Sequence, residues 1–437
     1  MTTSPNFPHI HLPFLDKVEL PMVMRVRLKH PSAPALADVS AAVVNELEKS
    51  LRVSGLPNGA KVAVAVGSRG IASIDHVVKA SVDWLKAKYF SPFIVPAMGS
   101  HGGGTKEGQI EVLAALGITE QTMGVPIEAT MEVVKYGTTS QGVDCVFDQN
   151  AAAADAVLAI NRVKSHTSFD RPVESGLSKL VAVGLGKGQG AMNMHALGTI
   201  GLSDVLPEIA RISLRESPIF FGLALVENPD KQLVIVEGAE PEAFHEVDER
   251  LLKKAKSLLA KLPFDQIDAL VVEVLGKNIS GAGMDYAVTG RTDIRGVDNP
   301  PTPFVHRLGV LGMTKEAKGN GIGVGMADYA PRDLANSLDL FSMYFNAVTA
   351  TFMEKARMPI VLPTDLDVFR ACVSTCWVAE PKRARLAIIK STLHLNEILV
   401  SPSLYEDITK SDNVTLVEDA QSIEFSDVGT LQTRCNI

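Results

Sequence analysis

Six apolar, β-branched runs without polar alternation restrict the fold of this sequence more than any other feature. Continuous apolar runs of this length are typical of strands that are covered on both faces. They predict parallel sheets packed between helices. The runs are KVAVAVG (61–67), FIVPAMG (93–99), DAVLAIN (155–161), FGLALVE (221–227), ALVVEVLG (269–276) and RLAIIKST (385–392).

Helical patterns lie between these runs. The segment 74–89 carries apolar residues at helical spacing, and 105–117 opens with Thr105 as an N-cap and stops at Gly117. The segment 245–263 is the clearest amphipathic helix. Alternating strands and helices predict an α/β fold with mostly parallel sheets.

The chain of 437 residues is long enough for two or three domains. We expect the helix 245–263 to end at Pro263 and a domain boundary to lie close to this proline. The prediction is an N-terminal catalytic and cofactor-binding domain (1–263) and a C-terminal α/β domain (264–437). The second domain is expected to complete an active-site cleft between the two, and its tail to pack back on the first.

Composition excludes several classes of function. The net charge is −8 and no basic stripe interleaved with aromatics occurs, which disfavours a nucleic-acid partner. No apolar stretch reaches the roughly 18 residues of a membrane span, and the N-terminus lacks the order of a signal peptide. The spacing of the four cysteines does not fit a zinc ribbon, and a disulfide framework is not expected in a chain this long, which favours reduced thiols. We expect a cytoplasmic protein without a membrane partner.

Three loops follow predicted strands and carry basic side chains. Arg69 follows the first strand, His101 the second, and Lys164 with His166 the third. Because sites in parallel sheets gather at the carboxyl ends of strands, we expect these loops to meet. Two imidazoles facing one cavity can serve as general acid and base near neutral pH. A single loop histidine is more often only solvated or hydrogen-bonded.

The loop GSHGGGT leaves backbone N–H groups available to an anion. Gly102 and Gly103 follow His101, and Thr105 begins a helix whose positive end assists. The alternative is a tight strand-to-helix turn, which glycine also permits. The loop lacks the Lys-Ser/Thr ending of a Walker loop, which disfavours ATP. GLGKGQG has Gln189 where a third glycine should be, which disfavours a Rossmann nicotinamide site.

Five motifs in this order resemble the nickel-pincer lactate racemase family. They are GSRG, AMGSHGGGT, VKSH, SGLSK and GAMNMH, within about residues 60–200. The resemblance implies a racemase or epimerase of a 2-hydroxy acid, working by reversible hydride transfer to a nickel-pincer nucleotide. This cofactor is pyridinium-3-thioamide-5-thiocarboxylic acid mononucleotide with Ni²⁺. It further implies, as partners, a small-molecule 2-hydroxy acid and the enzymes of cofactor synthesis. Oligomeric state is not indicated.

Residue roles follow from the same resemblance. His101 and His166 match the catalytic acid/base pair, and Arg69 matches a residue that contacts substrate. Lys179 matches the lysine that tethers the cofactor covalently, and His195, sixteen positions later, matches the nickel ligand.

The glycines between Lys179 and His195 predict a backbone that passes close to the flat cofactor. Gly102 and Gly103 are further cofactor-binding candidates. Lys187 either pairs with the nucleotide phosphate or is a solvated loop lysine.

A later motif departs from the family. Tyr286 and Thr289 occupy the positions of a glutamine and a lysine that contact substrate. The loss of that charge predicts a larger or differently substituted hydroxy acid rather than lactate, unless Lys277 or Arg291 compensates. The glycine-rich run 312–329 either lines the cleft or is a surface loop.

Two other functions remain open from the residues alone. One is a cofactor-independent enzyme of the same fold that uses the histidines on an acidic substrate. The other is a non-enzymatic protein that binds a metal or a nucleotide.

Overall fold

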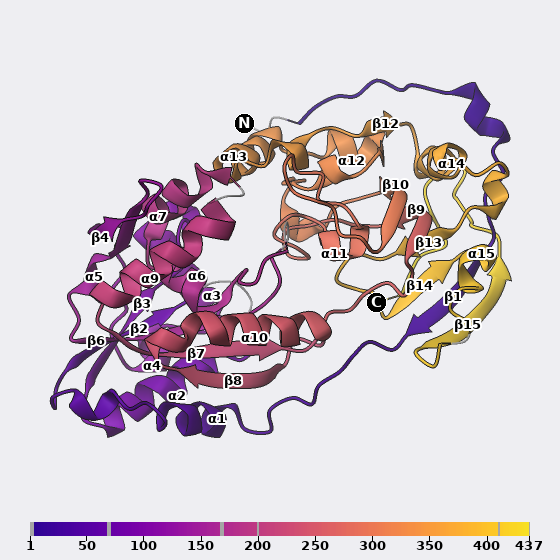
Figure 1. Cartoon of the computed structure of the whole chain (residues 1–437). Coiled ribbons are helices and arrows are strands. Elements are labelled where there is room, and N and C mark those ends of the chain that lie inside the picture. Colours follow the sequence, from indigo (N-terminus) through magenta and orange to yellow (C-terminus); the bar gives the residue numbers. More distant parts are fainter. Residues whose placement is uncertain (1–3, 68–70, 167–169, 199–200, 410, 437) are drawn as a thin grey trace. The chain divides into compact units, whose positions relative to one another are not determined.

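The structure is a computed structural model that describes residues 4–67, 71–166, 170–198, 201–409 and 411–436 (Figure 1). The side chains of His195, Leu202 and Ser203 lie outside this description. The chain forms two compact units. We call Pro31–His166 with Asp170–Leu259 the N-terminal unit, and Met1–His30 with Ala260–Ile437 the C-terminal unit.

A five-stranded sheet of order β3-β2-β6-β7-β8 forms the centre of the N-terminal unit. The first four strands are parallel, and β8 pairs antiparallel with β7. A separate antiparallel pair, β4-β5, completes the strands. The strands are β2 (Lys61–Val66), β3 (Ser91–Pro96), β4 (Val133–Thr138), β5 (Asp144–Asp148), β6 (Ala156–Arg162), β7 (Ile219–Glu227) and β8 (Leu233–Ala239).

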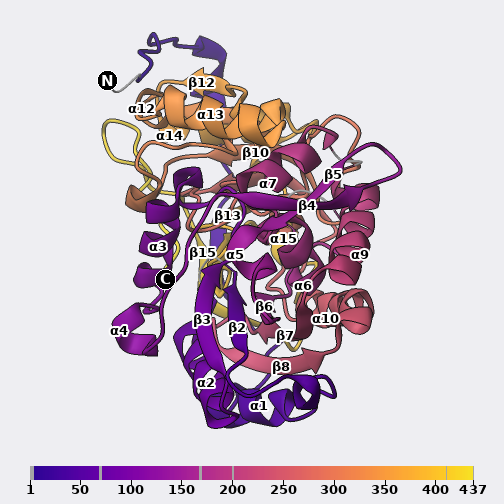
Figure 2. The ribbon, with the colours of Figure 1, turned by 90° about the vertical axis from the view of Figure 1, so that its left-hand side faces the viewer.

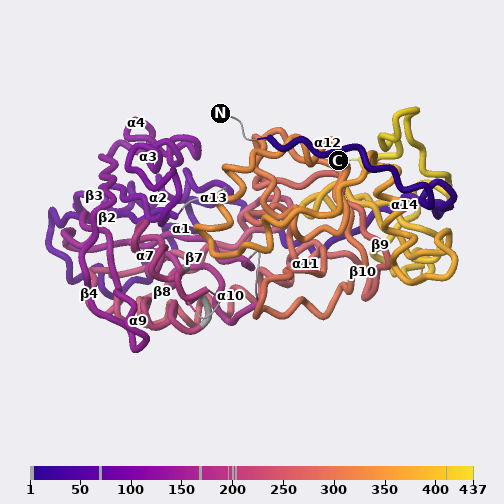
Figure 3. Tube along the Cα trace, turned by 90° about the horizontal axis from the view of Figure 1, so that it is seen from above, coloured from indigo at the N-terminus to yellow at the C-terminus, as the bar shows by residue number. Residues whose placement is uncertain are grey.

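Helices cover both faces of this sheet. The main helices are α1 (Val39–Leu47), α2 (Ile74–Ala87), α3 (Lys106–Ala115), α4 (Glu120–Met123), α5 (Gln149–Ala152), α6 (Gly176–Lys179), α7 (Lys187–His195), α9 (Leu206–Glu216) and α10 (Phe244–Ser257). Alternate residues of β2 face opposite sides: Val62 and Val64 join a core with α1 and α2, whereas Ala63 and Ala65 join one with α6 and α10. Figure 2 shows these helices on the two sides of the strands. Helices α3 and α4 lie on the side of α2, and β4 and α9 on the other (Figure 3).

An eight-stranded sheet of order β12-β11-β10-β9-β13-β14-β1-β15 forms the C-terminal unit. Its strands from β12 to β13 are parallel, and the remaining pairings are antiparallel. The strands are β1 (Val23–Leu28), β9 (Gln266–Val272), β10 (Phe304–Val310), β11 (Tyr329–Pro331), β12 (Ile360–Leu362), β13 (Leu386–Ile389), β14 (Glu397–Val400) and β15 (Val414–Gln421). The helices are α11 (Tyr286–Thr289), α12 (Arg332–Asn336), α13 (Leu340–Ala350), α14 (Asp365–Thr375) and α15 (Pro402–Tyr405).

The predicted α/β fold with mostly parallel sheets is confirmed. All six apolar runs contain strands, namely β2, β3, β6, β7, β9 and β13. Helix α10 ends at Ser257, before Pro263, so the proline does not terminate it. Within the described residues, no helix is both long and apolar enough to cross a bilayer.

The two units differ from the predicted domains 1–263 and 264–437 at the N-terminus. Residues 1–30 belong to the C-terminal unit because β1 pairs with both β14 and β15 (Figure 1). The tail packs on its own unit: the N–H of Cys435 donates to Glu273 at 2.6 Å. Backbone pairing that joins sequence-distant strands has no local signal in the chain.

Candidate active site

Three loops of the N-terminal unit leave the same edge of its sheet. Strands β3, β2 and β6 are adjacent and parallel, so their carboxyl ends meet at that edge. The loop after β3 carries His101 and the loop after β6 carries His166. The topology therefore brings the loops of both predicted histidines together. Arg69, in the loop after β2, lies outside the described residues.

The loop that carries His101 is held by its backbone. The N–H of His101 donates to the carbonyl of Met98 at 3.1 Å. The buried side chain of Gln109 donates to the carbonyl of Gly99 at 2.8 Å and to that of His101 at 3.4 Å. Thr105 is the N-cap of α3, as predicted. The partly exposed His101 thus sits on a turn with little conformational freedom.

The two glycines predicted to bind the cofactor have different surroundings. A Cβ on Gly102 would lie 2.4 Å from the carbonyl carbon of Gly108, so Gly102 permits the loop to pack on α3. A Cβ on Gly103 would meet no atom within 4 Å. Of the two, Gly103 has the open space that a bound group needs.

Glu174 holds the loop that carries His166. Its carboxylate accepts hydrogen bonds from the N–H groups of His166 and Arg171 and pairs with the ammonium of Lys256. The Glu174 side chain is fully buried, and this burial raises the pKa of its carboxyl against the opposing effect of these contacts. The backbone at His166 is therefore fixed from inside the unit, while the residue itself is partly exposed.

Asp248 of α10 fixes the short helix that ends in Lys179. Its two carboxylate oxygens accept from the N–H of Leu177 at 2.8 Å and of Ser178 at 2.7 Å. Burial raises the pKa of Asp248 to about 7, although these hydrogen bonds oppose the shift. Lys179 is partly exposed and donates to the carbonyl of Glu174 at 3.3 Å.

The glycine-rich segment after Lys179 is helical rather than a loop. It continues as a π-helix (Leu180–Gly184) and then as α7, which ends at His195. A Cβ on Gly184 would lie 2.6 Å from the carbonyl oxygen of Ala97, so this glycine packs the helix on the end of β3. The expectation of a glycine loop along the cofactor is thereby corrected at Gly184. Single π-helical turns occur frequently at functional sites.

Lys187 is neither a solvated loop lysine nor available to a phosphate. Its side chain is fully buried. Its ammonium donates to the carbonyl of Pro96 at 2.8 Å and to Oε1 of Gln109 at 2.7 Å, and it lies 3.2 Å from a carboxylate oxygen of Asp148. The ammonium thus donates two hydrogen bonds and forms one ion pair, all inside the N-terminal unit. The two predictions for Lys187, a phosphate contact and a solvated loop lysine, are both wrong. No local sequence pattern indicates that a lysine at the start of a helix is buried.

The predicted substrate-contact motif of the C-terminal unit, Tyr286 and Thr289, is buried. Tyr286 and Thr289 lie in α11 and are 6% and 0% exposed. The hydroxyl of Thr289 donates to the carbonyls of Asp285 and Arg291, both at 3.3 Å. The predicted substrate contact of Thr289 is corrected accordingly, since its only polar atom is used internally. The contact of Tyr286 stays a prediction.

The two cations expected to compensate for Thr289 also differ. Arg291 donates to the carbonyls of Val305 and Met326 and pairs with Asp328 at 2.9 Å, which makes it a structural residue. Lys277 is exposed and contacts Asn346.

Sequence reasoning missed a further lysine near this motif. Lys355 is 3% exposed, and burial lowers its pKa to about 8 despite the charge of Asp285. Its ammonium lies 5.7 Å from the ring centre of Phe352. Lys355 and Asp285 are far apart in the sequence, so no motif could have indicated that they interact.

The glycine-rich run 312–329 has two parts: 312–320 is exposed or half-buried except at Ala317, whereas most of 321–329 is buried within the C-terminal unit. A Cβ on Gly323 would lie 2.0 Å from the carbonyl oxygen of Ala282, so the run packs closely on the segment before α11. Its interpretation as a surface loop is therefore wrong for 321–329 only. Its role as a lining of the predicted cleft stays a prediction.

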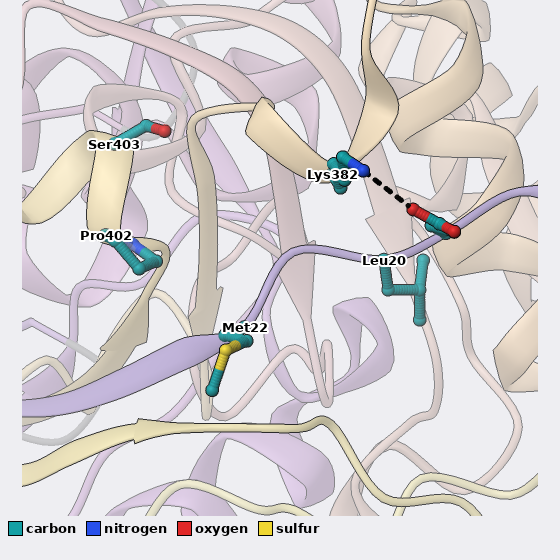
Figure 4. A pocket seen from close by; sticks show the side chains of 6 residues that line it. Leu20, Met22, Lys382, Pro402 and Ser403 are labelled. Carbon is teal, nitrogen blue, oxygen red and sulfur yellow. Dashed lines mark ion pairs between the residues drawn. The ribbon is translucent and has the colours of Figure 1, made fainter.

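A cavity of about 460 Å³ lies in the C-terminal unit. It is lined by Glu19, Leu20, Met22, Lys382, Pro402 and Ser403, and an ion pair joins Lys382 to Glu19 (Figure 4). None of the residues predicted from the sequence lines it. Among the described residues, no group of three or more metal-ligating side chains occurs.

Solved structures resemble the chain, and one of them does so along most of its length. It is the lactate racemase apoprotein from Thermoanaerobacterium thermosaccharolyticum, with a TM-score of 0.51 and 11% sequence identity. The similarity covers 90% of this chain and 99% of that one. No protein-family model and no curated protein matches the chain. At this identity the likeness shows the fold.

Proposed function

We propose that the chain is an isomerase that racemises or epimerises a 2-hydroxy acid. The observation that carries the proposal is the position of His101 and His166 after two strands that flank β2 in one parallel sheet. The fold likeness to a lactate racemase and the order of the five motifs support the same reaction class.

The proposed cofactor is a nickel-pincer nucleotide, with Lys179 as its covalent tether and His195 as its nickel ligand. The residues present fit such a group. Lys179 offers a partly exposed primary amine on a helix fixed by Asp248, and Gly103 borders open space. A neutral imidazole suits Ni²⁺, and a metal held mainly by the cofactor needs no cluster of protein ligands.

When bound, this cofactor supplies the acceptor and donor of the C2 hydride. The chain's own residues handle the proton on the C2 hydroxyl oxygen. One histidine removes it as the bond to hydrogen at C2 breaks, and the other returns a proton when the opposite enantiomer forms. Arg69 is proposed to hold the carboxylate through paired hydrogen bonds. With two histidines, a proton donor is present on either face of the planar 2-keto acid.

The proposed substrate is a 2-hydroxy acid larger than lactate. Thr289 and Arg291 are committed to internal contacts, so Tyr286 and the absence of a lysine at position 289 are the features that favour a larger substrate. A carboxylate that lacks a charged partner binds more weakly, by about 2–5 kcal/mol in comparable truncations. A panel of single-enantiomer hydroxy acids tests this, and fast turnover of lactate with nothing better would contradict it.

Intact-mass measurement tests the function as a whole. The chain is produced together with enzymes of cofactor synthesis, and the wild type should carry a covalent adduct. Lys179→Ala should return to the bare chain mass and lose all activity, whereas the matched control Lys164→Ala should keep the adduct. A bare mass for the wild type would instead favour a cofactor-independent enzyme or a binding protein. An adduct mapped to Lys164 would overturn the assignment of Lys179.

A further inference from the structure

A buried polar network connects α7 to the loop that carries His101. Lys187 is the first residue of α7, and its ammonium contacts Asp148 and Gln109. The amide of Gln109 in turn donates hydrogen bonds to the carbonyls of Gly99 and His101. Three segments that are distant in sequence, the end of β5, the start of α7 and α3, thus converge beneath one loop.

Each member of the network is fully buried. The side chains of Lys187 and Asp148 are 0% exposed, and Gln109 is 0% exposed as a residue. Burial alone lowers the pKa of Lys187 and raises that of Asp148, and the contact between the two charges opposes both shifts. Asp148 also accepts from the N–H groups of Asn150 and Ala151, both at 2.9 Å. Removing one partner of a buried ion pair leaves an uncompensated charge, so the two side chains hold each other in place.

The backbone of Lys187 supplies a second, independent observation. Its φ is 54°, in the left-handed region, although glycines are its neighbours on both sides in the sequence. A side chain in this region costs on the order of 1–2 kcal/mol, and it persists only where the surroundings dictate it. A glycine would relieve this strain but would lack the ammonium that contacts Asp148 and Gln109.

We propose that Lys187, Asp148 and Gln109 are positioning residues that fix the loop of His101 relative to α7. The inference rests on the proposed function, because only that function gives His101 and the end of α7 a shared task. Lys187 holds the start of the helix whose last residue is His195, and Gln109 holds the loop of His101. The network therefore sets the geometry between the proposed acid/base and the proposed metal ligand.

Gln109 is the residue to change, since its replacement leaves both charges of the ion pair in place. Gln109→Leu removes the donor to the loop, and Gln109→Glu keeps the volume and an acceptor for Lys187 but likewise removes that donor. The control is Gln121→Leu, which alters an exposed glutamine of α4 in the same unit. If Gln109→Leu fails to fold, Gln109→Glu carries the test.

Amide hydrogen exchange of the full chain without cofactor is the first readout. We expect peptides covering 99–105 to exchange at least about tenfold faster in both Gln109 variants, while peptides of β7 and β8 stay as in the wild type. Unchanged exchange in 99–105 relative to Gln121→Leu would overturn the proposal. Because this readout needs no adduct, it remains decisive if wild-type Lys179 is found unloaded, a result that counts against the proposed function instead.

Kinetics of the loaded enzyme are the second readout. Misplacement of a catalytic group costs about 100-fold in rate, so we expect kcat to fall by about this factor with KM changed less than about threefold. Adduct mass on Lys179 should be unchanged. A network with only a structural role would lower the melting temperature and leave kcat of the folded fraction intact, which would also overturn the proposal.

Discussion

The predicted site residues of the two units differ in exposure and in the partners of their polar atoms. In the N-terminal unit, His101, His166 and Lys179 are partly exposed, and buried polar side chains bind the backbone at or next to them. In the C-terminal unit, Thr289 and Arg291 direct their polar atoms into their own backbone. The loops at the carboxyl ends of parallel strands all lie at one edge of the sheet, so their location can be predicted from the sequence. The sequence of a short helix does not show which of its sides is buried.

The largest expected effect lies in the N-terminal unit. His101→Ala should slow racemisation by about 10²–10⁴-fold, because each turnover in one direction needs a proton transfer at this position. The rate is measured from single enantiomers by chiral chromatography, with His76→Ala, an exposed histidine of α2, as the control. Racemisation by His101→Ala at nearly the wild-type rate would remove the two-base mechanism.

Loss of the buried ion pair should be the next largest effect. Lys187→Met leaves Asp148 charged and unpaired, which should lower the free energy of unfolding by about 3–5 kcal/mol. Trp84 is 5% exposed in the N-terminal unit and Trp377 is 86% exposed, so tryptophan fluorescence reports mainly on this unit. The double change Lys187→Met with Asp148→Asn should recover much of the loss. Equal losses in both variants would show that the pair is not coupled.

Asp248 should make the N-terminal unit less stable as pH rises. Its folded pKa of about 7 exceeds the usual unfolded value of about 3.9, so the folded state binds more protons between these values. The free energy of unfolding should fall by on the order of 4 kcal/mol from about pH 4 to about pH 7 on this account. Asp248→Asn should flatten the slope, measured by Trp84 fluorescence in urea. The same slope in the variant would assign the effect to other groups.

Lys355 should give the C-terminal unit the opposite dependence. Its folded pKa of about 8 lies below the usual 10.4, so the unfolded state binds more protons between these values. Stability should rise by about 3 kcal/mol from pH 8 to above 10. Hydrogen exchange of β9 and β13 peptides follows this unit, and Lys355→Met should abolish the rise. A rise confined to the N-terminal unit would break the comparison.

The smallest expected effect belongs to Thr289. Thr289→Val removes a hydroxyl that donates only to backbone carbonyls, so it should cost about 1 kcal/mol of stability. The ratio kcat/KM should stay within about twofold of the wild type, with Thr292→Val as a second buried threonine for comparison. A KM that rises tenfold would place Thr289 at the substrate after all.

The sequence predicted the parallel core and the convergence of the histidine loops, because both follow from apolar runs and from the geometry of parallel strands. It could not predict the residues that hold those loops. Glu174, Asp248 and Gln109 look like ordinary surface residues of helices or turns, and only tertiary packing reveals that they are buried. The burial of Lys187 has no sequence signal for the same reason, since a lysine between glycines is normally solvated.

The place of β1 in the C-terminal sheet has a consequence for biosynthesis. This strand is synthesised before the N-terminal unit, whereas its partners β14 and β15 are synthesised after that unit. The N-terminal unit, encoded from Pro31 to Leu259, has all its strands long before then. We expect it to fold during translation while Val23 and Val26, both buried in the finished protein, remain exposed as a ligand for chaperones.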